Sequence, residues 1–412
     1  MPVEVAVEQA HRRAWGLVLA STARLLGDLD EAEECTQDAF VAALETWPVR
    51  GVPANPDAWL TTTARRRALD LLRRRSTLRR KLPLLLVDNE REDGTTMPAD
   101  TGAVADDRLR LVFTCCHPAL SRDAQVALTL RLVCGVPVSD IAAAVLTAEP
   151  TVAARITRAK KKIAAAAIPF RVPRAADLPA RLDAVLTVVY LVYTLGHTAP
   201  TGTTVDDSEL AERALQLARA LVTLMPDEPE VRGLLGLLLL THARRGARVG
   251  ETGGLVLLED QDHTRWDADA IREGVAWTTS AMVPAPGRFA VQAAIAACHA
   301  EARSFSATDW HRVVALHDLL LEAWPSPVVR LNRAAALAFA DGPDAALAEV
   351  DALAGEPGLR GYHYLPAARA DLLRRLGRTR EAAEEYRRAI ALCRNESEVT
   401  FLEARLVSLS TP

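Results

Sequence analysis

Two separate basic stretches with a helical pattern lie on this chain, and they constrain its fold more than any other feature. One runs from Trp59 to Arg80 and the other from Thr147 to Lys162. Nine basic residues and one acid lie between Arg65 and Lys81, and seven basic residues and no acid lie between Thr151 and Arg174. Two cationic helices on one chain predict a protein that binds DNA through two separate segments.

The charge is distributed unevenly along the 412 residues, although the net charge is only -4. Residues 1–174 carry +4 (25 basic against 21 acidic residues), and residues 175–412 carry -8 (24 against 32). Half of the residues are hydrophobic, and Ala, Leu and Arg dominate, which favours helices that bury a core. We therefore predict an all-α, multidomain protein with a DNA-binding front part and an acidic back part.

The six cysteines form no CxxC pair and no spacing typical of a disulfide framework, so we expect reduced thiols. No charged start with an apolar run indicates a secretory signal. The longest apolar stretches, Ala184–Gly196 and Gly233–Leu240, are too short to span a bilayer. These features predict a cytoplasmic protein.

Two groups of residues could suggest a metal site, but their patterns do not support one. Cys115, Cys116 and His117 are adjacent, which gives poor chelate geometry, and no second pair follows. An acidic cluster (Asp260, Asp262, Asp267 and Asp269) lacks the glycine and terminal glutamate of a calcium loop. No phosphate-binding glycine loop or nucleophile motif is present. We expect no metal, no cofactor and no enzyme activity.

The second basic stretch has the layout of the recognition helix of a helix-turn-helix. Val138–Val145 is the expected supporting helix, Leu146–Glu149 the turn, and Pro150 the first residue of the next helix. Core-facing positions at helical spacing are Val152, Ile156, Ala159 and Ile163. Residues expected on the outer face are Thr151, Ala154, Arg155, Arg158, Lys161 and Lys162. Such a helix can enter a major groove while its cations contact phosphates; a solvated basic face is the alternative.

The first basic stretch is the last of three helices expected over residues 3–81. Asp30 is the expected cap of the second helix, in which Phe40, Leu44 and Trp47 should face inward. Inward positions of the third helix are Leu60, Ala64, Ala68 and Leu71, and another face carries Arg66, Asp70, Arg73 and Arg74. Trp59, Thr61 and Thr62 add an aromatic ring and hydroxyls beside the cations, a combination suited to melted DNA. Trp59 could equally be a core residue.

The remaining sequence predicts a linker and a helical-repeat region. Pro83–Ala105 is rich in Pro, Gly and acids and shows no helical period. From Tyr364 the small and aromatic positions follow a tetratricopeptide pattern: Ala370, Gly377, Ala382, Tyr386 and Ala389. Counterparts lie 35 or 36 residues upstream at Gly342, Ala346, Val350 and Leu353. The alternative is an ordinary Ala- and Leu-rich bundle. We expect domains at 1–81, 106–168 and 175–412, with a flexible acidic linker at 82–105.

Together these motifs resemble an extracytoplasmic-function sigma factor of the sigma-70 family. DLDEAEECTQDAFVAALETWP is similar to the acidic helix by which such factors bind core RNA polymerase. PDAWLTTTARRRALDLLRR is similar to the helix that melts and reads the -10 promoter element, and the helix-turn-helix is similar to the -35 reader. LRLVFTCCHPALSRDAQVALTLRL, EDQDHTRWDADAIREG and YHYLPAARADLLRRLGR resemble a subgroup with a long tetratricopeptide-like extension.

The resemblance implies a role for each matching residue. Residues matching the polymerase-binding helix are Glu31, Glu34, Gln37, Asp38 and Phe40. Residues matching the -10 helix are Trp59, Thr61, Arg65, Arg66, Arg67, Asp70, Arg73 and Arg74. The -35 set is Thr151, Ala154, Arg155, Arg158, Lys161 and Lys162. Many such factors have Asn where this chain has Arg66, so no -10 sequence preference is carried over.

The expected function is therefore promoter-specific initiation of transcription with core RNA polymerase, modulated by the C-terminal extension through a regulatory protein or an intramolecular contact. Two other functions remain open at this point. A helix-turn-helix regulator with a sensing repeat domain needs only one DNA-binding helix. An interaction scaffold would use the repeats as its function and the front part for docking. Polymerase binding and promoter-dependent activity would separate the three.

Overall fold

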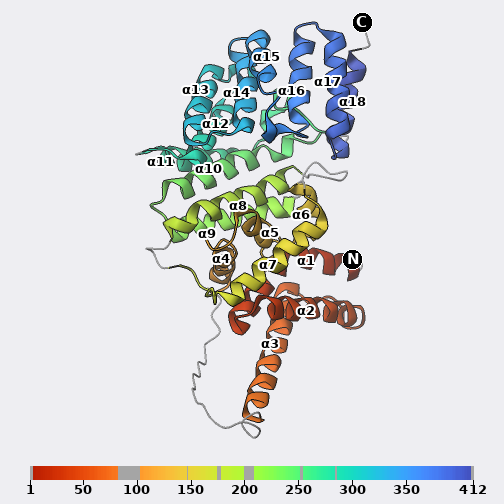
Figure 1. Cartoon of the computed structure of the whole chain (residues 1–412), viewed down its shortest axis with the longest axis vertical. Coiled ribbons are helices and arrows are strands. Elements are labelled where there is room, and N and C mark those ends of the chain that lie inside the picture. Colours follow the sequence, from red (N-terminus) through yellow and green to blue (C-terminus); the bar gives the residue numbers. More distant parts are fainter. Residues whose placement is uncertain are drawn as a thin grey trace. The chain divides into compact units, whose positions relative to one another are not determined.

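The computed structural model of the chain describes residues 3–81, 103–145, 147–173, 178–198, 208–250, 254–283 and 285–409. These residues form eighteen α-helices and several short 3₁₀ turns, and their β structure is one isolated bridge between Val249 and Leu255. The all-α prediction is confirmed. The chain divides into two compact units, Met1–Val192 and Tyr193–Pro412, so the division falls inside the eighth helix (Figure 1). Most of the expected linker, residues 82–102, lies outside the described residues.

Eight helices begin in the first unit. They are α1 (Val3–Leu26), α2 (Leu29–Arg50), α3 (Pro56–Lys81), α4 (Ala103–Cys115), α5 (Arg122–Leu132), α6 (Val138–Ala144), α7 (Glu149–Ala165) and α8 (Pro179–His197), the last crossing the division. α4 begins at Ala103, before the expected end of the linker at Ala105. In Figure 1 the C-terminal half of α3 extends beyond α1 and α2.

The three helices expected over residues 3–81 are present, with two local differences. Gly27 ends α1 with a φ of 68°, and Asp28 rather than Asp30 caps α2, since its carboxylate accepts from the backbone N–H groups of Asp30 and Glu31. Leu44 does not face inward, because 47% of it is exposed and the buried position of that turn is Ala43. The small Ala43 lets the helices approach closely, which the spacing of large residues did not reveal.

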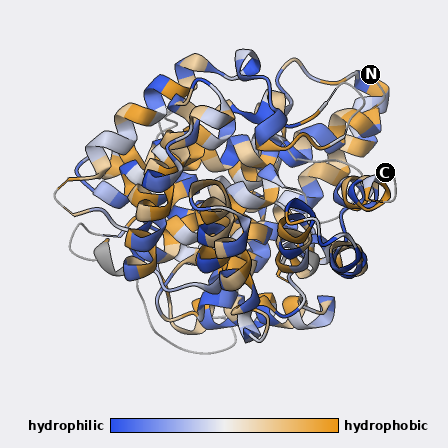
Figure 2. Ribbon diagram, turned by 90° about the horizontal axis from the view of Figure 1, so that it is seen from above, coloured by the Kyte–Doolittle hydropathy of each residue, from blue (hydrophilic) through white to orange (hydrophobic). Residues whose placement is uncertain are grey.

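The second unit is a succession of helices in which neighbours along the chain pack together. Its helices are α9 (Ser208–Leu224), α10 (Pro229–Ala243), α11 (Ala268–Ala281), α12 (Arg288–Glu301), α13 (Trp310–Ala323), α14 (Pro327–Ala340), α15 (Pro343–Asp351), α16 (Tyr364–Arg375), α17 (Thr379–Leu392) and α18 (Glu396–Ser408). Short 3₁₀ turns are η3 (Arg245–Ala247), η4 (Leu258–Asp260), η5 (His263–Arg265), η6 (Phe305–Ala307) and η7 (Pro357–Leu359). Hydrophobic and hydrophilic residues are interspersed along the helices of the chain, as one-sided burial requires (Figure 2).

The helices α13 to α17 carry a repeated ion-pair arrangement. Arg333 of α14 bonds Asp318 of the preceding helix (2.5 Å) and Glu349 of the following one. Thirty-six residues later, Arg369 of α16 bonds Asp351 (2.7 Å) and Glu385 (3.3 Å) in the same sense. The small and aromatic positions expected from the sequence are buried: Ala346, Val350, Leu353, Ala370, Ala382, Tyr386 and Ala389. The structure therefore contains an arrangement that repeats after 36 residues. Its assignment as tetratricopeptide-like stays a prediction.

Candidate nucleic-acid interface

Helix α7 has the orientation expected of a recognition helix within its own domain. Val152, Ile156, Ala159 and Ile163 are each at most 6% exposed, as the periodicity predicted. The helix begins at Glu149, so Pro150 occupies its second position rather than its first. The exposed members of the expected outer face are Thr151, Ala154, Arg158, Lys161 and Lys162. Arg155 is half-buried and lies 3.3 Å from Asp123 of α5, so its charge is partly engaged within the domain.

Helix α3 carries its cations on the side opposite its buried residues. Leu60, Ala64 and Ala68 are fully buried, while Leu71 is only half-buried. Three arginines form no ion pair with a carboxylate in the described part of the chain: Arg65, Arg66 and Arg74. Arg67 lies 2.5 Å from Asp38 of α2, and Arg73 lies 3.1 Å from Asp70.

The aromatic and hydroxyl groups at the start of α3 are held by the domain itself. Trp59 is half-buried and meets Trp47 of α2 edge to face, with ring centroids 5.6 Å apart. The hydroxyl of Thr61 donates to the carbonyl of Asp57 (2.8 Å). Trp59 therefore has both properties that the sequence left open, because one part of the indole packs and another faces solvent.

The residues of α2 that are predicted to bind polymerase divide into three groups. Glu34 and Gln37 are exposed and available to a partner. Glu31 bonds Arg75, and Asp38 bonds Arg67, so these two acids link α2 to the basic helix α3. Phe40 is only 7% exposed and packs against Trp15 and His11 of α1, with centroids 6.0 and 5.1 Å away. Phe40 thus belongs to the core that holds α2 in place.

A buried acid that sequence reasoning missed joins the two basic domains. Glu33 of α2 has a side chain only 12% exposed, and it bonds both Arg131 of α5 (2.9 Å) and Lys160 of α7. Lys160 also lies 2.9 Å from Asp30. Burial opposes the charge of Lys160, but the hydrogen bonds and charges of Glu33 and Asp30 outweigh this and raise its pKa. No local pattern could reveal these partners, because they lie 98 to 130 residues apart in the chain.

Backbone packing reinforces this junction. A Cβ at Gly16 of α1 would lie 1.9 Å from the carbonyl oxygen of Val133, so only glycine permits this approach. Arg131 lies over the ring of Trp15, 5.4 Å from its centroid. Arg24 of α1 lies 3.0 Å from Asp107 of α4, whose side chain is 2% exposed. Helices α1–α3 and α4–α7 therefore pack as one compact unit in this structure.

Comparison with known proteins assigns the same regions. The sigma-70 region 2 family matches residues 10–77, and the sigma-70 region 4 family matches residues 110–163. Residues 181–282 match a family of unknown function (DUF6596). An uncharacterized protein of Rhizobium meliloti (strain 1021) is 42% identical over 411 residues, covering 99% of this chain and 96% of that protein. No solved structure matches the chain.

Two further observations bear on the class of protein. None of the helices in the described part is long and apolar enough to cross a membrane. Regions 2 and 4 occur in the order and spacing of a sigma factor, and each coincides with one of the basic helices described above. The chain belongs to the sigma-70 family and is a sigma factor that directs transcription initiation by core RNA polymerase at promoter DNA, with a C-terminal domain of unknown function.

Proposed function

We propose that this sigma factor reads its promoter through the exposed faces of α3 and α7. In α7, Thr151, Ala154 and Arg158 would meet base edges and phosphates of the -35 element, with Lys161 and Lys162 on the backbone. In α3, Trp59, Arg65 and Arg66 would hold the melted -10 strand, supported by Arg73 and Arg74. The observation that carries this proposal is the exposure of Arg158, Lys161, Lys162 and Arg66 opposite fully buried apolar faces.

The proposed polymerase contact centres on the exposed part of α2. Glu34 and Gln37 would contact polymerase directly, because their side chains are exposed. Glu31 and Asp38 already bond Arg75 and Arg67 of α3. A basic polymerase surface that competes for these two acids would release the arginines toward DNA, which couples polymerase binding to readiness of the -10 helix. Phe40 would contribute by fixing α2 against α1.

The compact packing of regions 2 and 4 supports an additional step before promoter binding. The -10 and -35 elements lie about two turns of DNA apart, roughly 70 Å along the axis. Residues 82–102 can span at most about 70 Å when fully extended. In the free chain, Lys160 instead bonds Asp30 and Glu33 of α2. We propose that polymerase binding to α2 breaks these bonds and lets the two DNA-reading domains separate.

The C-terminal extension is proposed to modulate this activity in the same chain. The net charge of residues 175–412 is -8, whereas that of residues 1–174 is +4. An acidic extension can compete with DNA or polymerase for basic surfaces, or it can bind a regulatory protein through its helical repeats. Either role leaves the chemistry of RNA synthesis to the polymerase.

Run-off transcription with sigma-free core polymerase and a genomic promoter library tests the proposal. The full chain should produce discrete new start sites. Arg158→Ala should weaken -35-dependent starts, and it should lower the salt dependence of DNA binding by about one phosphate contact. Arg66→Ala should reduce strand opening, read by permanganate reactivity, more than it reduces closed-complex binding.

The matched control is Arg380→Ala, since Arg380 is 93% exposed in the C-terminal unit and far from either basic helix in sequence. Tight binding to duplex DNA without new start sites, in the presence of polymerase that the chain retains in a pull-down, would contradict the proposal. Charge reversal by Glu34→Lys should lower polymerase retention, whereas Glu384→Lys on α17 should not.

A further inference from the structure

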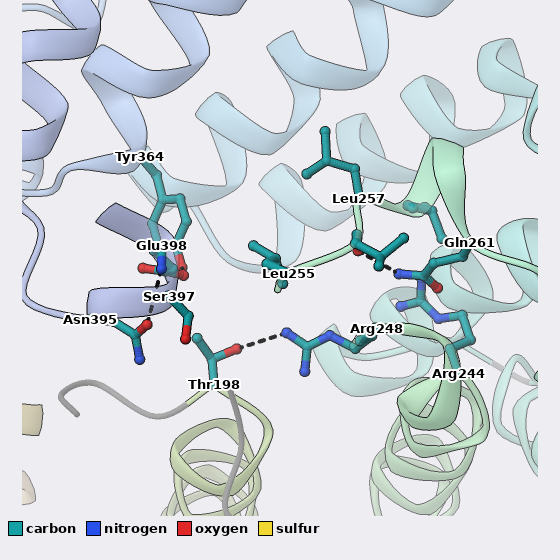
Figure 3. Close-up of a pocket in the computed structure, with 12 residues that line it drawn as sticks. Thr198, Arg244, Arg248, Leu255, Leu257, Gln261, Tyr364, Asn395, Ser397 and Glu398 are labelled. Carbon is teal, nitrogen blue, oxygen red and sulfur yellow. Dashed lines mark hydrogen bonds between the residues drawn. The ribbon is translucent and has the colours of Figure 1, made fainter. Parts of the chain in front are cut away.

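A pocket of about 250 Å³ lies within the C-terminal unit, away from every residue assigned above to DNA or polymerase. One wall comes from the end of α10 and the turn η3, with Arg244 and Arg248 (Figure 3). The loop Leu255–Leu258 forms an apolar middle, and the start of α18 forms the opposite wall with Asn395, Ser397 and Glu398. This volume is below the roughly 300–1,000 Å³ of drug-sized sites, so it suits a small metabolite.

Arg244 is the most unusual residue of this pocket. Its Nε is buried without a hydrogen-bond partner, and within the described part of the chain it forms no ion pair with a carboxylate. Its guanidinium lies over the ring of Trp266, 5.8 Å from the guanidinium carbon to the centroid. A ring contact on the guanidinium face leaves the N–H groups at the edge available. Burial and then the neighbouring Arg248 lower the pKa of Arg244 to about 10, so the group remains charged at neutral pH.

The surroundings of Arg244 are positive rather than neutral. Arg248 is the second cation on this wall, and its guanidinium donates to the carbonyl of His197 and to the hydroxyl of Thr198. Burial, followed by Arg248 and Arg244, lowers the pKa of His197 to about 2. Burial and Arg244 lower that of His299 to about 4. Among the described residues no carboxylate pairs with Arg244, and a buried cation in that situation costs free energy that a bound anion would recover.

A further polar group is also left without a partner. Gln261 donates from Nε2 to the carbonyl of Val256 (3.2 Å), while its buried Oε1 accepts from no group in the described residues. Gln261 and Arg244 both line the pocket, and both are labelled in Figure 3. A ligand that carries both an anionic group and an N–H or O–H donor would satisfy both residues at once.

The opposite wall is already balanced in charge. Glu398 accepts from the hydroxyl of Tyr364 (2.5 Å) and lies 3.1 Å from Nε2 of His363. Possible metal ligands on His363, Cys393 and Glu398 lie within 4.8 Å of one another. Burial opposes a charge on His363, but bonds to Cys393 and Glu398 outweigh it and raise its pKa to about 9. The carboxylate of Glu398 is therefore already engaged by Tyr364 and His363, and the cluster favours a hydrogen-bonding wall over a metal site.

We propose that this pocket binds a small organic or inorganic anion, a carboxylate or a phosphate, whose charged group pairs with Arg244 and Arg248 and whose donor group meets Gln261. The loop Leu255–Leu258 covers the apolar part of the ligand, and Ser397 and Asn395 line the far end. We assign the pocket to an effector, because it lies in the C-terminal unit and contains none of the residues predicted to contact DNA or polymerase.

Binding is measured directly on the full-length protein by thermal unfolding and calorimetry. The probes are inorganic phosphate, acetate, succinate and glutamate, each compared with chloride at equal ionic strength. At least one probe should raise the melting temperature saturably, by about 5–10 °C at a hundredfold excess over its Kd. A response to phosphate alone identifies a phosphate ligand, and a response to the carboxylates alone identifies a carboxylate ligand.

Arg244→Gln should abolish the response, and the control Arg380→Gln should keep it. Leu257→Trp, which fills the pocket without removing a charge, is a second test if Arg244→Gln folds poorly. The proposal is overturned if no probe exceeds chloride, or if Leu257→Trp and a folded Arg244→Gln respond like the wild type. A shift produced by Zn²⁺ and reversed by a chelator, with no anion effect, would overturn it in favour of a metal at His363.

The prediction that the ligand changes transcription rests on the proposed function of the C-terminal extension. The prediction that the pocket binds an anion does not. The identified anion should change the yield of run-off transcripts at least about threefold with wild type and not with Arg244→Gln. Binding without any change in transcription would leave the pocket established and would instead refute modulation by the extension through this pocket.

Discussion

The two units of this sigma factor hold their helices together in different ways. In the first unit, residues far apart in the chain form specific contacts, such as the ion pair of Glu33 with Lys160 and the close backbone approach of Gly16 to Val133. In the second, each helix packs on its neighbours in sequence, and Arg333 and Arg369 repeat one ion-pair arrangement. Contacts between distant residues in the first unit can be lost together if regions 2 and 4 separate. In the second unit, where neighbours pack in succession, we expect the stability to be close to a sum over neighbouring helices.

The largest expected effect comes from adding a single methyl group at Gly16. Gly16→Ala should lower the free energy of unfolding of the first unit by about 3 kcal/mol or more, because the new Cβ would meet a backbone oxygen that cannot move aside. Urea unfolding followed by hydrogen exchange would locate the loss. The control is Gly246→Ala, where the nearest atom lies 3.6 Å away and little change is expected. A neutral Gly16→Ala would mean that α1 and α5 do not pack closely.

The next test removes the acid shared between regions 2 and 4. Glu33→Gln should cost about 2–4 kcal/mol, since it leaves Arg131 and Lys160 half-buried without their common carboxylate. It should also increase the distance between α2 and α7, as measured by fluorescence energy transfer between labels on the two helices. Glu34→Gln changes the exposed neighbour and should alter neither quantity. Equal effects of the two substitutions would refute a closed first unit.

The stability of the second unit should depend on pH through His363. Its pKa rises from an ordinary 6.5 to about 9 in the folded state, so its contribution is fully present below pH 6.5 and disappears as the pH rises through about 9. The free energy of unfolding should fall by about 1–3 kcal/mol over this range. Each unit of pKa shift corresponds to about 1.4 kcal/mol, and coupling to Cys393 reduces the part that belongs to His363. Urea unfolding of wild type and His363→Gln from pH 6 to 10 gives this difference. The exposed His311→Gln should retain the wild-type profile.

The smallest effects should come from the repeated arginines. Arg333→Met and Arg369→Met should each cost about 1 kcal/mol, because both side chains are partly exposed and each holds two carboxylates. The two values should be similar and should add within about 0.5 kcal/mol in the double variant, since they share no partner. A strongly non-additive result, measured by urea unfolding, would show that the array does not behave as a repeat.

Local sequence patterns were sufficient for much of the candidate interface. The 3.6-residue period predicted the buried faces of α3 and α7. The inward positions of Leu60, Ala64 and Ala68 are confirmed by their burial. Two predictions for α2 were wrong. Leu44 was expected to be buried, but the small Ala43 takes the buried position, and Asp30 was expected to cap the helix, but the backbone geometry makes Asp28 the cap. The roles of the individual interface residues remain predictions, since burial alone does not identify a DNA or polymerase contact.

By itself, the sequence determined which segments are helical, which faces they bury and where the two basic helices lie, because these properties depend on neighbours within a few turns. Only the tertiary structure decided that Lys160 pairs with Glu33, that Phe40 lies in a core, and that Arg244 stands in a pocket with Gln261 and Ser397. Contacts between such distant residues depend on how whole helices pack. Amphipathic periodicity specifies the buried side of a helix but not which partner covers it.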